Sequence, residues 1–171
     1  MARAESSDPL HGFRFHVTTT DVPEFLQSAA EEFQVGAEAG FQSVSLPERS
    51  VEVVEYREGT MTHTRKFPGV ETFTNCTLMR GVTKTDTAFF DWVAAAVEGG
   101  TYRSDMTIYH WHRDGKTASQ LADVDAARKY VCHESFPSRV KIAGDLDATS
   151  SEVSMQEVDV EVEWFEVEDA S

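Results

Sequence analysis

The sequence predicts a mainly β protein, an antiparallel barrel or sandwich that carries one flanking α-helix. Several segments alternate apolar and polar residues, as half-buried strands do, beginning with residues 13–17. Residues 86–100 instead combine a broad apolar face with helical spacing and end on two glycines. With 171 residues and an apolar fraction of 40%, the chain is expected to form one domain, residues 1–171, around an ordinary core.

The N-terminal segment mixes three patterns. Residues 1–11 are polar and are expected to form a flexible arm, and residues 13–17 form the first strand. Residues 21–36 then break the strand period. Asp21 and Glu24 have the spacing of a capping box, which predicts a short helix inserted at this point.

A hairpin is predicted next. The valines of residues 41–56 change phase between residues 53 and 54, and this slip predicts a β-bulge there. Residues 57–66 are polar and are expected to form a long loop. Residues 67–70, Phe-Pro-Gly-Val, predict a turn, and residues 71–81 predict another strand.

The C-terminal half contains the predicted helix and the last strands. Thr83 or Asp86 is expected to cap the helix, whose apolar face consists of five residues: Phe89, Phe90, Val93, Ala96 and Val97. The remaining predicted elements are a strand over 106–112, a turn at Asp114-Gly115, an insertion over 116–129, and strands over 129–142 and 151–168.

The segment 155–168 carries like charges along one strand face. Four acidic residues alternate with four apolar ones: Glu157, Asp159, Glu161 and Glu163 with Val158, Val160, Val162 and Trp164. Carboxylates about 7 Å apart on a strand repel each other by about 0.6 kcal/mol per pair in water. We therefore expect the valine face to be buried, and the acidic face to be hydrated or opposed by cations.

Charge and composition exclude several functions. Asp and Glu number 30 against 15 Lys and Arg, a net charge of −15, which repels nucleic acid and anionic membranes and favours a basic protein partner or a high-salt cytoplasm. No apolar run approaches a membrane span of about 18 residues, so no membrane insertion is expected. The polar N-terminus lacks a signal-type apolar region, which predicts synthesis in the cytoplasm. Cys76 and Cys132 are predicted to be buried thiols.

Candidate catalytic or metal-binding residues are few. His110 and His112 share a strand face and could join His133 in a three-histidine metal site, but nothing fixes the third ligand, and ordinary strand histidines are the simpler interpretation. No sequence motif of a hydrolase, nucleotide-binding protein or metalloprotease is present. We therefore expect no enzyme, no catalytic residue, no metal and no cofactor.

Four blocks in order carry a resemblance to a known family. They are AGFQSVSLPERSVEVVEYREG (39–59), RKFPGVETFTNCTLMRGVT (65–83), the aromatic helix FFDWVAAAVEG, and FPSRVKIAGDLDATSSEVSMQEVDVEVE (136–163). Together they cover about two-thirds of the chain. In these blocks the sequence resembles the tail tube proteins of contractile phages and of phage-tail-like injection particles.

This resemblance implies a structural role. Such subunits fold as an antiparallel β-barrel or sandwich with a flanking helix, six copies close a ring, and rings stack into a hollow tube inside a contractile sheath. The implied partners are the sheath protein, baseplate or spike proteins, tail-terminator proteins, and a DNA or protein cargo in the lumen. The chain would begin in the cytoplasm and end in a virion tail or injection particle.

The resemblance also assigns surfaces. The acidic row Glu157, Asp159, Glu161 and Glu163 would face the lumen or the sheath. The hairpin loop would reach the adjacent ring through six residues: Arg57, Glu58, Gly59, Thr60, Met61 and Arg65. Lys66 and Trp92 are candidate subunit contacts. Three alternatives stay open: a tube-initiating ring at the baseplate, a soluble ligand- or metal-binding β-barrel, and an acidic adaptor that only binds a basic partner.

Overall fold

A computed structural model describes residues 14–20, 41–82, 87–99, 102–111 and 126–169, together with Leu10 and Gly12. These residues are mainly β, every strand pairing is antiparallel, and one helix flanks the strands, so the predicted fold class is confirmed. The elements in chain order are β1 (Phe15–Thr20), β2 (Ser43–Ser45), β3 (Arg49–Tyr56), β4 (Arg65–Phe73), β5 (Cys76–Gly81), α2 (Ala88–Glu98), β6 (Ser104–His110), β7 (Arg128–Lys141), β8 (Met155–Glu161) and β9 (Trp164–Asp169).

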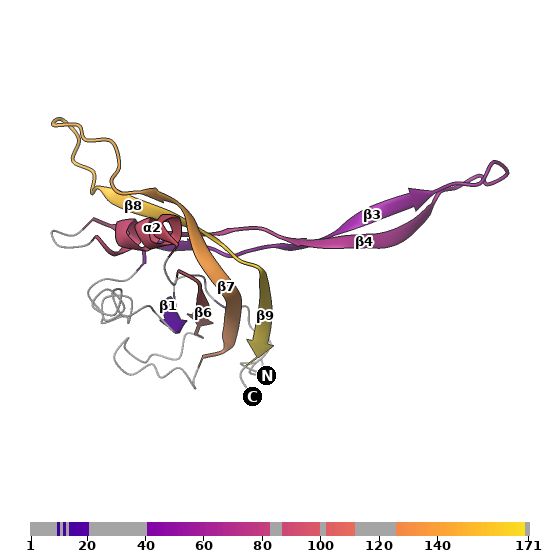
Figure 1. The fold of residues 1–171 in the computed structure, drawn as a ribbon, viewed down its shortest axis with the longest axis horizontal. Coiled ribbons are helices and arrows are strands. Elements are labelled where there is room, and N and C mark those ends of the chain that lie inside the picture. The colour runs from indigo at the N-terminus through magenta and orange to yellow at the C-terminus, as the bar shows by residue number, and fades with distance from the viewer. Residues whose placement is uncertain are drawn as a thin grey trace, which may run out of the picture.

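Strand β7 joins the two halves of the main sheet. Its first half pairs with β6 and β9, and its second half, from Phe136 onward, pairs with β8. β1 extends the first half beyond β6, while β5 and β2 extend the second half beyond β8. β7 bends between these halves, so the sheet folds over on itself (Figure 1).

One hydrophobic core fills the space between the two halves and the helix. Both halves and α2 contribute buried side chains: Val17, Met106, Ile108 and Cys132 from the first half, Cys76, Leu78, Val158, Val160 and Val162 from the second, and Phe89 and Trp92 from the helix. The valine face of β8 is therefore buried, as the alternation predicts. Cys76 and Cys132 are free and fully buried, which confirms the two buried thiols.

The bend in β7 is built around a bulge at His133 and Glu134. These two residues lie opposite the single residue Asp105 of β6, because Ser104 pairs with Ser135 and Met106 with Cys132. Glu134 has a φ of 51°, a left-handed conformation that costs a non-glycine residue about 1–2 kcal/mol. The Asp105 carboxylate offsets this cost, since it accepts a hydrogen bond from the Glu134 amide at 3.0 Å.

Strands β3 and β4 form a separate two-stranded ribbon that projects far from the body (Figure 1). This extended hairpin, residues 49–73, continues the β2–β5 pair without a change of register: Glu48 and Thr74 exchange two hydrogen bonds, of 2.8 and 3.0 Å, between the paired segments. The direction of the ribbon is therefore set by the β2–β5 pair, which it extends.

The extended hairpin has a bulge near the predicted place, but the extra residue lies in β4 and not in the valine strand β3. The register shifts between Val51 and Val53, where Gly69 and Val70 of β4 lie opposite Glu52 alone. Residues 67–70 are thus inside a strand, and the turn predicted from Phe-Pro-Gly-Val is wrong. Glycine is required here because a Cβ at position 69 would lie 3.0 Å from Val54 Cγ2 and 3.1 Å from the Glu52 carbonyl oxygen.

The helix α2 packs on the sheet through a face that differs from the apolar face predicted from the spacing of its residues. Phe89, Trp92 and Ala95 are buried, whereas Phe90 and Val97 are exposed. The Trp92 indole donates a hydrogen bond to the Tyr102 carbonyl at 2.8 Å. Trp92 is only 3% exposed, so the structure argues against the predicted subunit contact at this residue.

Both helix ends are defined by threonine and glycine. Thr87 occupies the N-cap position without a side-chain bond to the backbone, and its hydroxyl instead bonds to Asp91 at 2.8 Å. At the other end Gly99 has a φ of 77° and donates its N–H to the Ala95 carbonyl, so the predicted glycine stop is confirmed. The predicted caps, Thr83 and Asp86, lie outside the described residues.

The predicted last strand, 151–168, is in fact two strands. β8 ends at Glu161, and β9 begins at Trp164 and pairs with the first half of β7. The break changes which alternate residues face the core. Up to Val162 the even-numbered side chains are buried, whereas beyond it Trp164 is 41% exposed and Phe165 packs against the core. Glu163 therefore lies in the break and does not extend the β8 row.

Several predictions concern residues that the structure does not describe. They are the arm over 1–11 apart from Leu10, the helix over 21–36, His112, the Asp114-Gly115 turn, and residues 116–125 of the predicted insertion over 116–129. The described residues 128 and 129 belong to β7. Across the described ranges, no helix has both the length and the apolar character that a bilayer span requires.

Candidate assembly surfaces

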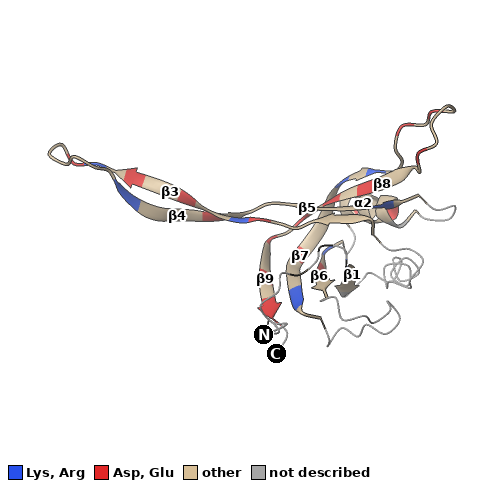
Figure 2. Ribbon diagram, turned by 180° about the vertical axis from the view of Figure 1, so that it is seen from behind, with Lys and Arg blue, Asp and Glu red and all other residues tan. Residues whose placement is uncertain are grey.

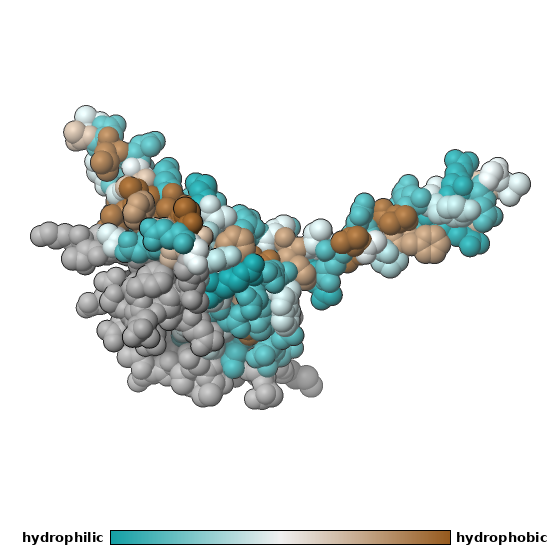
Figure 3. Space-filling view, in the orientation of Figure 1, coloured by the Kyte–Doolittle hydropathy of each residue, from teal (hydrophilic) through white to brown (hydrophobic). Residues whose placement is uncertain are grey.

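The extended hairpin exposes apolar side chains on both of its faces. Val54 lies opposite Phe67 on one face, and Val53 lies opposite Pro68 on the other, since paired residues of antiparallel strands share a face. Six of its apolar residues are each 47–67% exposed: Val51, Val53, Val54, Tyr56, Phe67 and Val70. Their surface is spread along the ribbon in Figure 3.

A ribbon of this kind needs a partner. An isolated two-stranded hairpin is marginally stable in water, because neither face is covered. Contiguous exposed apolar surface on a soluble protein typically marks an interaction site. Both strand edges of the ribbon are also unpaired in the described structure, and such edges are templates for pairing with another chain. The extended hairpin is therefore the strongest candidate for an assembly surface.

The loop residues that the sequence singles out lie at the far end of this hairpin. Arg57, Glu58, Gly59, Thr60 and Met61 follow the last residue of β3, and the Met61 amide donates to the Glu58 carbonyl at 3.0 Å. Arg65 is the first residue of β4. Lys66 is predicted to contact a neighbouring subunit. In the single chain its Nζ lies 3.5 Å from the Glu55 carboxylate of the same hairpin and forms an ion pair with it.

The acidic row of β8 is opposed by a basic residue of β7. Arg139 Nε donates to Asp159 at 2.6 Å, and its guanidinium also bonds to Glu157. Figure 2 shows red segments of β8 beside blue segments of β7. Lys141 lies opposite Glu157 in the register and adds a second positive charge. The predicted acidic face opposed by cations is thus present inside the subunit for Glu157 and Asp159, the two carboxylates that Arg139 binds.

Asp159 is the most enclosed member of the row, with a side chain 15% exposed. Burial alone would raise the pKa of this carboxyl. Hydrogen bonds from Arg139 and from the Thr77 hydroxyl, the latter 2.9 Å long, outweigh burial and hold the pKa below its usual value. Asp159 is therefore ionised at neutral pH and bridges β5, β8 and β7.

Replacing Asp159 with asparagine is expected to lower the free energy of unfolding of the dilute chain by roughly 1 kcal/mol at pH 7. Because the folded-state pKa is depressed, this contribution is present above the unfolded-state value of about 4 and fades as the pH falls through the folded-state pKa. Urea unfolding at pH 7 and at successively lower pH checks this. Glu168→Gln, an exposed carboxylate on β9, is the control and should change stability little. A deficit in Asp159→Asn that persists unchanged at pH 2 would contradict the assignment.

Glu163, at the break after β8, is held by a different arginine. Its carboxylate bonds to Arg103, whose Nη1 also lies 3.6 Å from Glu134 at the bulge of β7. Arg139 therefore binds Glu157 and Asp159, and Arg103 binds Glu163. For Glu161, which lies between them, the described residues give no ion pair. Glu161 is the row member with the most free charge.

The two described histidines of the predicted metal site, His110 and His133, do not converge on one site. His133 Nδ1 lies 3.2 Å from Asp105, and its ring stacks on Trp164 with centroids 3.9 Å apart. His110 lies at the far end of β6, opposite Arg128. Among the residues that the structure describes, no group of three His, Cys, Asp or Glu side chains is placed to hold a metal ion. Burial raises the pKa of both thiols, that of Cys132 to about 12, so neither is a reactive nucleophile.

Sequence reasoning missed Arg139, Arg103 and Asp105. A signal existed for the first, because Arg139 and Lys141 alternate in the strand that precedes the acidic row, as a cation row paired with it would. No signal identified Asp105, whose role depends on a bulge at His133 and Glu134 that contains no glycine or proline.

Comparison with known proteins agrees with this geometry. The family model of the T4-like virus tail tube protein gp19 matches residues 11–166. No curated protein sequence matches the chain. A chain of the PVC sheath–tube complex of an extracellular contractile injection system superposes with a TM-score of 0.73 at 24% identity, covering 96% of this chain and 95% of that one.

Two other solved structures are similar over comparable lengths. A chain of the PVC sheath/tube terminator has a TM-score of 0.71 at 25% identity, covering 95% of this chain and 98% of that one. A chain of the anti-feeding prophage baseplate has a TM-score of 0.72 at 18% identity, covering 96% and 99%. The resemblance carried by the four sequence blocks is thereby confirmed. The chain belongs to the T4-like tail tube protein family.

Proposed function

We propose that this chain is a structural subunit of the inner tube of a contractile phage tail or injection particle. Six copies close a ring, and rings stack into a hollow tube that conducts DNA or a protein effector without reacting with it. One observation carries the proposal: the extended hairpin exposes apolar residues on both faces, and β3 and β4 pair with no other strand among the described residues, so its surface fits a site between other copies.

The proposed partners follow from the same family membership. The similar solved structures come from a sheath–tube complex, a sheath/tube terminator and a baseplate determined with sixfold symmetry. These support a sheath around the tube, baseplate or spike proteins at one end and a terminator at the other. The chain acts as one domain over 1–171, with insertions over 21–36 and 116–127, the second ending before β7 begins at Arg128, and after synthesis in the cytoplasm it is built into the particle.

The acidic row is assigned to the lumen. Arg139 binds Glu157 and Asp159 within the subunit, and Lys141 lies opposite Glu157, so these carboxylates need no basic sheath surface against them. Glu161 keeps a carboxylate for which no ion pair is described, and a hydrated channel accommodates such a charge without a partner. A lumen with few free cations also suits passage of DNA, because nonspecific DNA affinity comes from basic contacts.

The mass of the purified chain in solution tests the proposal. Six chains of 19.1 kDa give 6 × 19.1, about 115 kDa, so we expect this species and larger multiples to increase with protein concentration. Light scattering coupled to size exclusion measures it. A species of 19 kDa that persists at all accessible concentrations would exclude a self-assembling subunit. Rings of 115 kDa that never stack would indicate the tube-initiating ring instead.

A further inference from the structure

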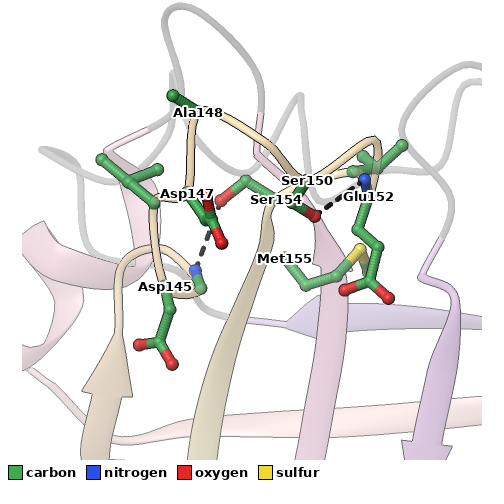
Figure 4. A pocket seen from close by; sticks show the side chains of 10 residues that line it. Asp145, Asp147, Ala148, Ser150, Glu152, Ser154 and Met155 are labelled. Carbon is green, nitrogen blue, oxygen red and sulfur yellow. Dashed lines mark hydrogen bonds between the residues drawn. The ribbon is translucent and has the colours of Figure 1, made fainter.

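The loop between β7 and β8 curves around an open pocket that the proposed function does not explain. This acidic loop, residues 142–154, and the start of β8 surround a space of about 660 Å³ (Figure 4). Pockets that hold small ligands have volumes of about 300–1,000 Å³, so this one has room for a large side chain and its neighbours. Leu146 and Val153 line it and are 87% and 75% exposed in the single chain.

Hydrogen bonds within the acidic loop give the pocket a defined shape. The Asp147 carboxylate accepts from the amide and the hydroxyl of Thr149, at 2.8 and 2.7 Å, and these bonds hold its pKa below the usual range. The Gly144 amide donates to the Ser154 hydroxyl at 3.3 Å. The Val82 amide, just beyond β5, donates to the Ser154 carbonyl at 2.9 Å. The pocket is therefore present before any partner binds.

The charge of the loop predicts the sign of its partner. Residues 142–154 contain three carboxylates and no basic residue, a net charge of −3. Asp145, Asp147 and Glu152 all contribute to the lining of the pocket. An occupant that combines an apolar side chain with positive charge satisfies both features.

The distal half of the extended hairpin has this combination. On one face Val54 lies opposite Phe67, and Tyr56 lies opposite Arg65, so two aromatic rings adjoin a guanidinium. Arg57 follows Tyr56 in the loop. Across residues 53–68, three basic residues against two acidic ones leave a net charge of +1 (3 − 2), in a chain whose total is −15.

One chain cannot bring these two surfaces together. The acidic loop and the tip of the extended hairpin lie at opposite ends of the long axis of the molecule (Figure 1). Figure 3 shows exposed apolar surface at both ends. A contact between such surfaces is head-to-tail, and a head-to-tail contact repeats from copy to copy, as rings and tubes require.

We propose that the pocket of the acidic loop receives the distal part of the extended hairpin of a second copy of this chain. Tyr56 or Phe67 enters the pocket against Leu146 and Val153, and the guanidinium groups of Arg57 and Arg65 pair with Asp145 and Glu152. This inference rests on the proposed function, since it names the receiving surface for the hairpin of a tube subunit.

Charge exchange tests the pairing. Arg57→Glu with Arg65→Glu, and separately Asp145→Arg with Glu152→Arg, are each expected to raise the protein concentration needed for assembly about tenfold or more, equivalent to at least about 1.4 kcal/mol per contact. The variant that carries all four substitutions is expected to assemble within about threefold of the wild-type concentration. Glu98→Arg with Glu168→Arg, which changes the charge by the same amount elsewhere on the body, is the matched control and should assemble normally.

The outcomes separate this inference from the proposed function. If the wild type never assembles, the proposed function itself fails. If the wild type assembles and the loop variant assembles equally well, the receiving site is wrong while the tube function stands. Failure of the fourfold variant to recover, with circular dichroism showing a folded chain, would also overturn the pairing.

Cross-linking gives an independent measurement of proximity. Tyr56→Cys together with Leu146→Cys is expected to yield, under mild oxidation, a ladder of covalent multimers of the 19.1 kDa chain on non-reducing gels. The native Cys76 and Cys132 are fully buried and should not contribute. Neither single variant should proceed beyond a dimer. A double variant that gives no ladder while still assembled would contradict the proposed contact.

Discussion

Removal of the extended hairpin is expected to abolish self-assembly and to leave the body folded. In the variant, an Asn-Gly turn replaces residues 49–73 between Glu48 and Thr74. These two residues already form a hydrogen-bonded pair, so a two-residue turn fits their geometry. None of the buried residues of the core cluster lies in the deleted segment. Among the described aromatic contacts, the body loses the edge contact of Phe73 with Phe165, worth about 1 kcal/mol.

Sedimentation and circular dichroism measure this result together. We expect a folded single chain at concentrations where the wild type forms larger species, because the exposed apolar surface that associates has been removed. Thr60→Ser, a change at the tip that removes one methyl group, is the control and should assemble as the wild type does. Rings or tubes formed by the shortened chain would show that the hairpin is not the surface that joins copies.

Trp92→Ala is expected to cost about 3–5 kcal/mol of unfolding free energy in the dilute chain. The substitution empties a space between α2 and the sheet and leaves the Tyr102 carbonyl without its indole donor. Urea unfolding measures the loss. Phe90→Ala is the matched control on the same helix: Phe90 is 55% exposed, so its removal should cost less than about 1 kcal/mol in the single chain.

This comparison also separates two roles for the helix. If Trp92 were a subunit contact, its removal would leave the single chain stable and weaken assembly instead. A loss below about 1 kcal/mol for Trp92→Ala would therefore contradict its place in the core. Substitution of Phe90 or Val97 should instead leave the single chain stable and weaken assembly, because both side chains are exposed and free to contact a neighbouring subunit.

The parts of the fold that the sequence predicted are those where one strand face packs on a core. Alternation identified the buried valines of β8, because burial of one face imposes a period of two. The two buried thiols followed from composition. Residue order across four blocks identified the family, which alternation alone could not do.

The predictions failed where backbone geometry depends on distant residues. The bend of β7 needs a left-handed Glu134 held by Asp105, 29 residues earlier in the chain, and no local pattern marks it. The phase reversal between Val162 and Trp164 likewise depends on β9 moving to a new pairing position along β7. Residues 67–70 looked like a turn because proline and glycine are common in turns, yet here they form a bulge within a strand.

The assembly surfaces were partly predictable. The polar loop over 57–65 was identified, but the exposure of Val53, Val54 and Tyr56 was not, because alternation indicates a strand and not whether a second layer covers it. The acidic row was identified as a face that stays unburied or opposed by cations. The ion pairs of Glu157 and Asp159 with Arg139 depend on the pairing of β7 with β8, which the sequence did not specify.

A cryo-electron microscopy reconstruction of the assembled wild-type chain tests the tube function and the role of the hairpin together. We expect stacked sixfold rings, in which each extended hairpin lies against another copy and Glu161 faces the channel. Particles in which the hairpins extend into solvent without contacting another copy, or a chain that stays single at every concentration, would contradict this expectation.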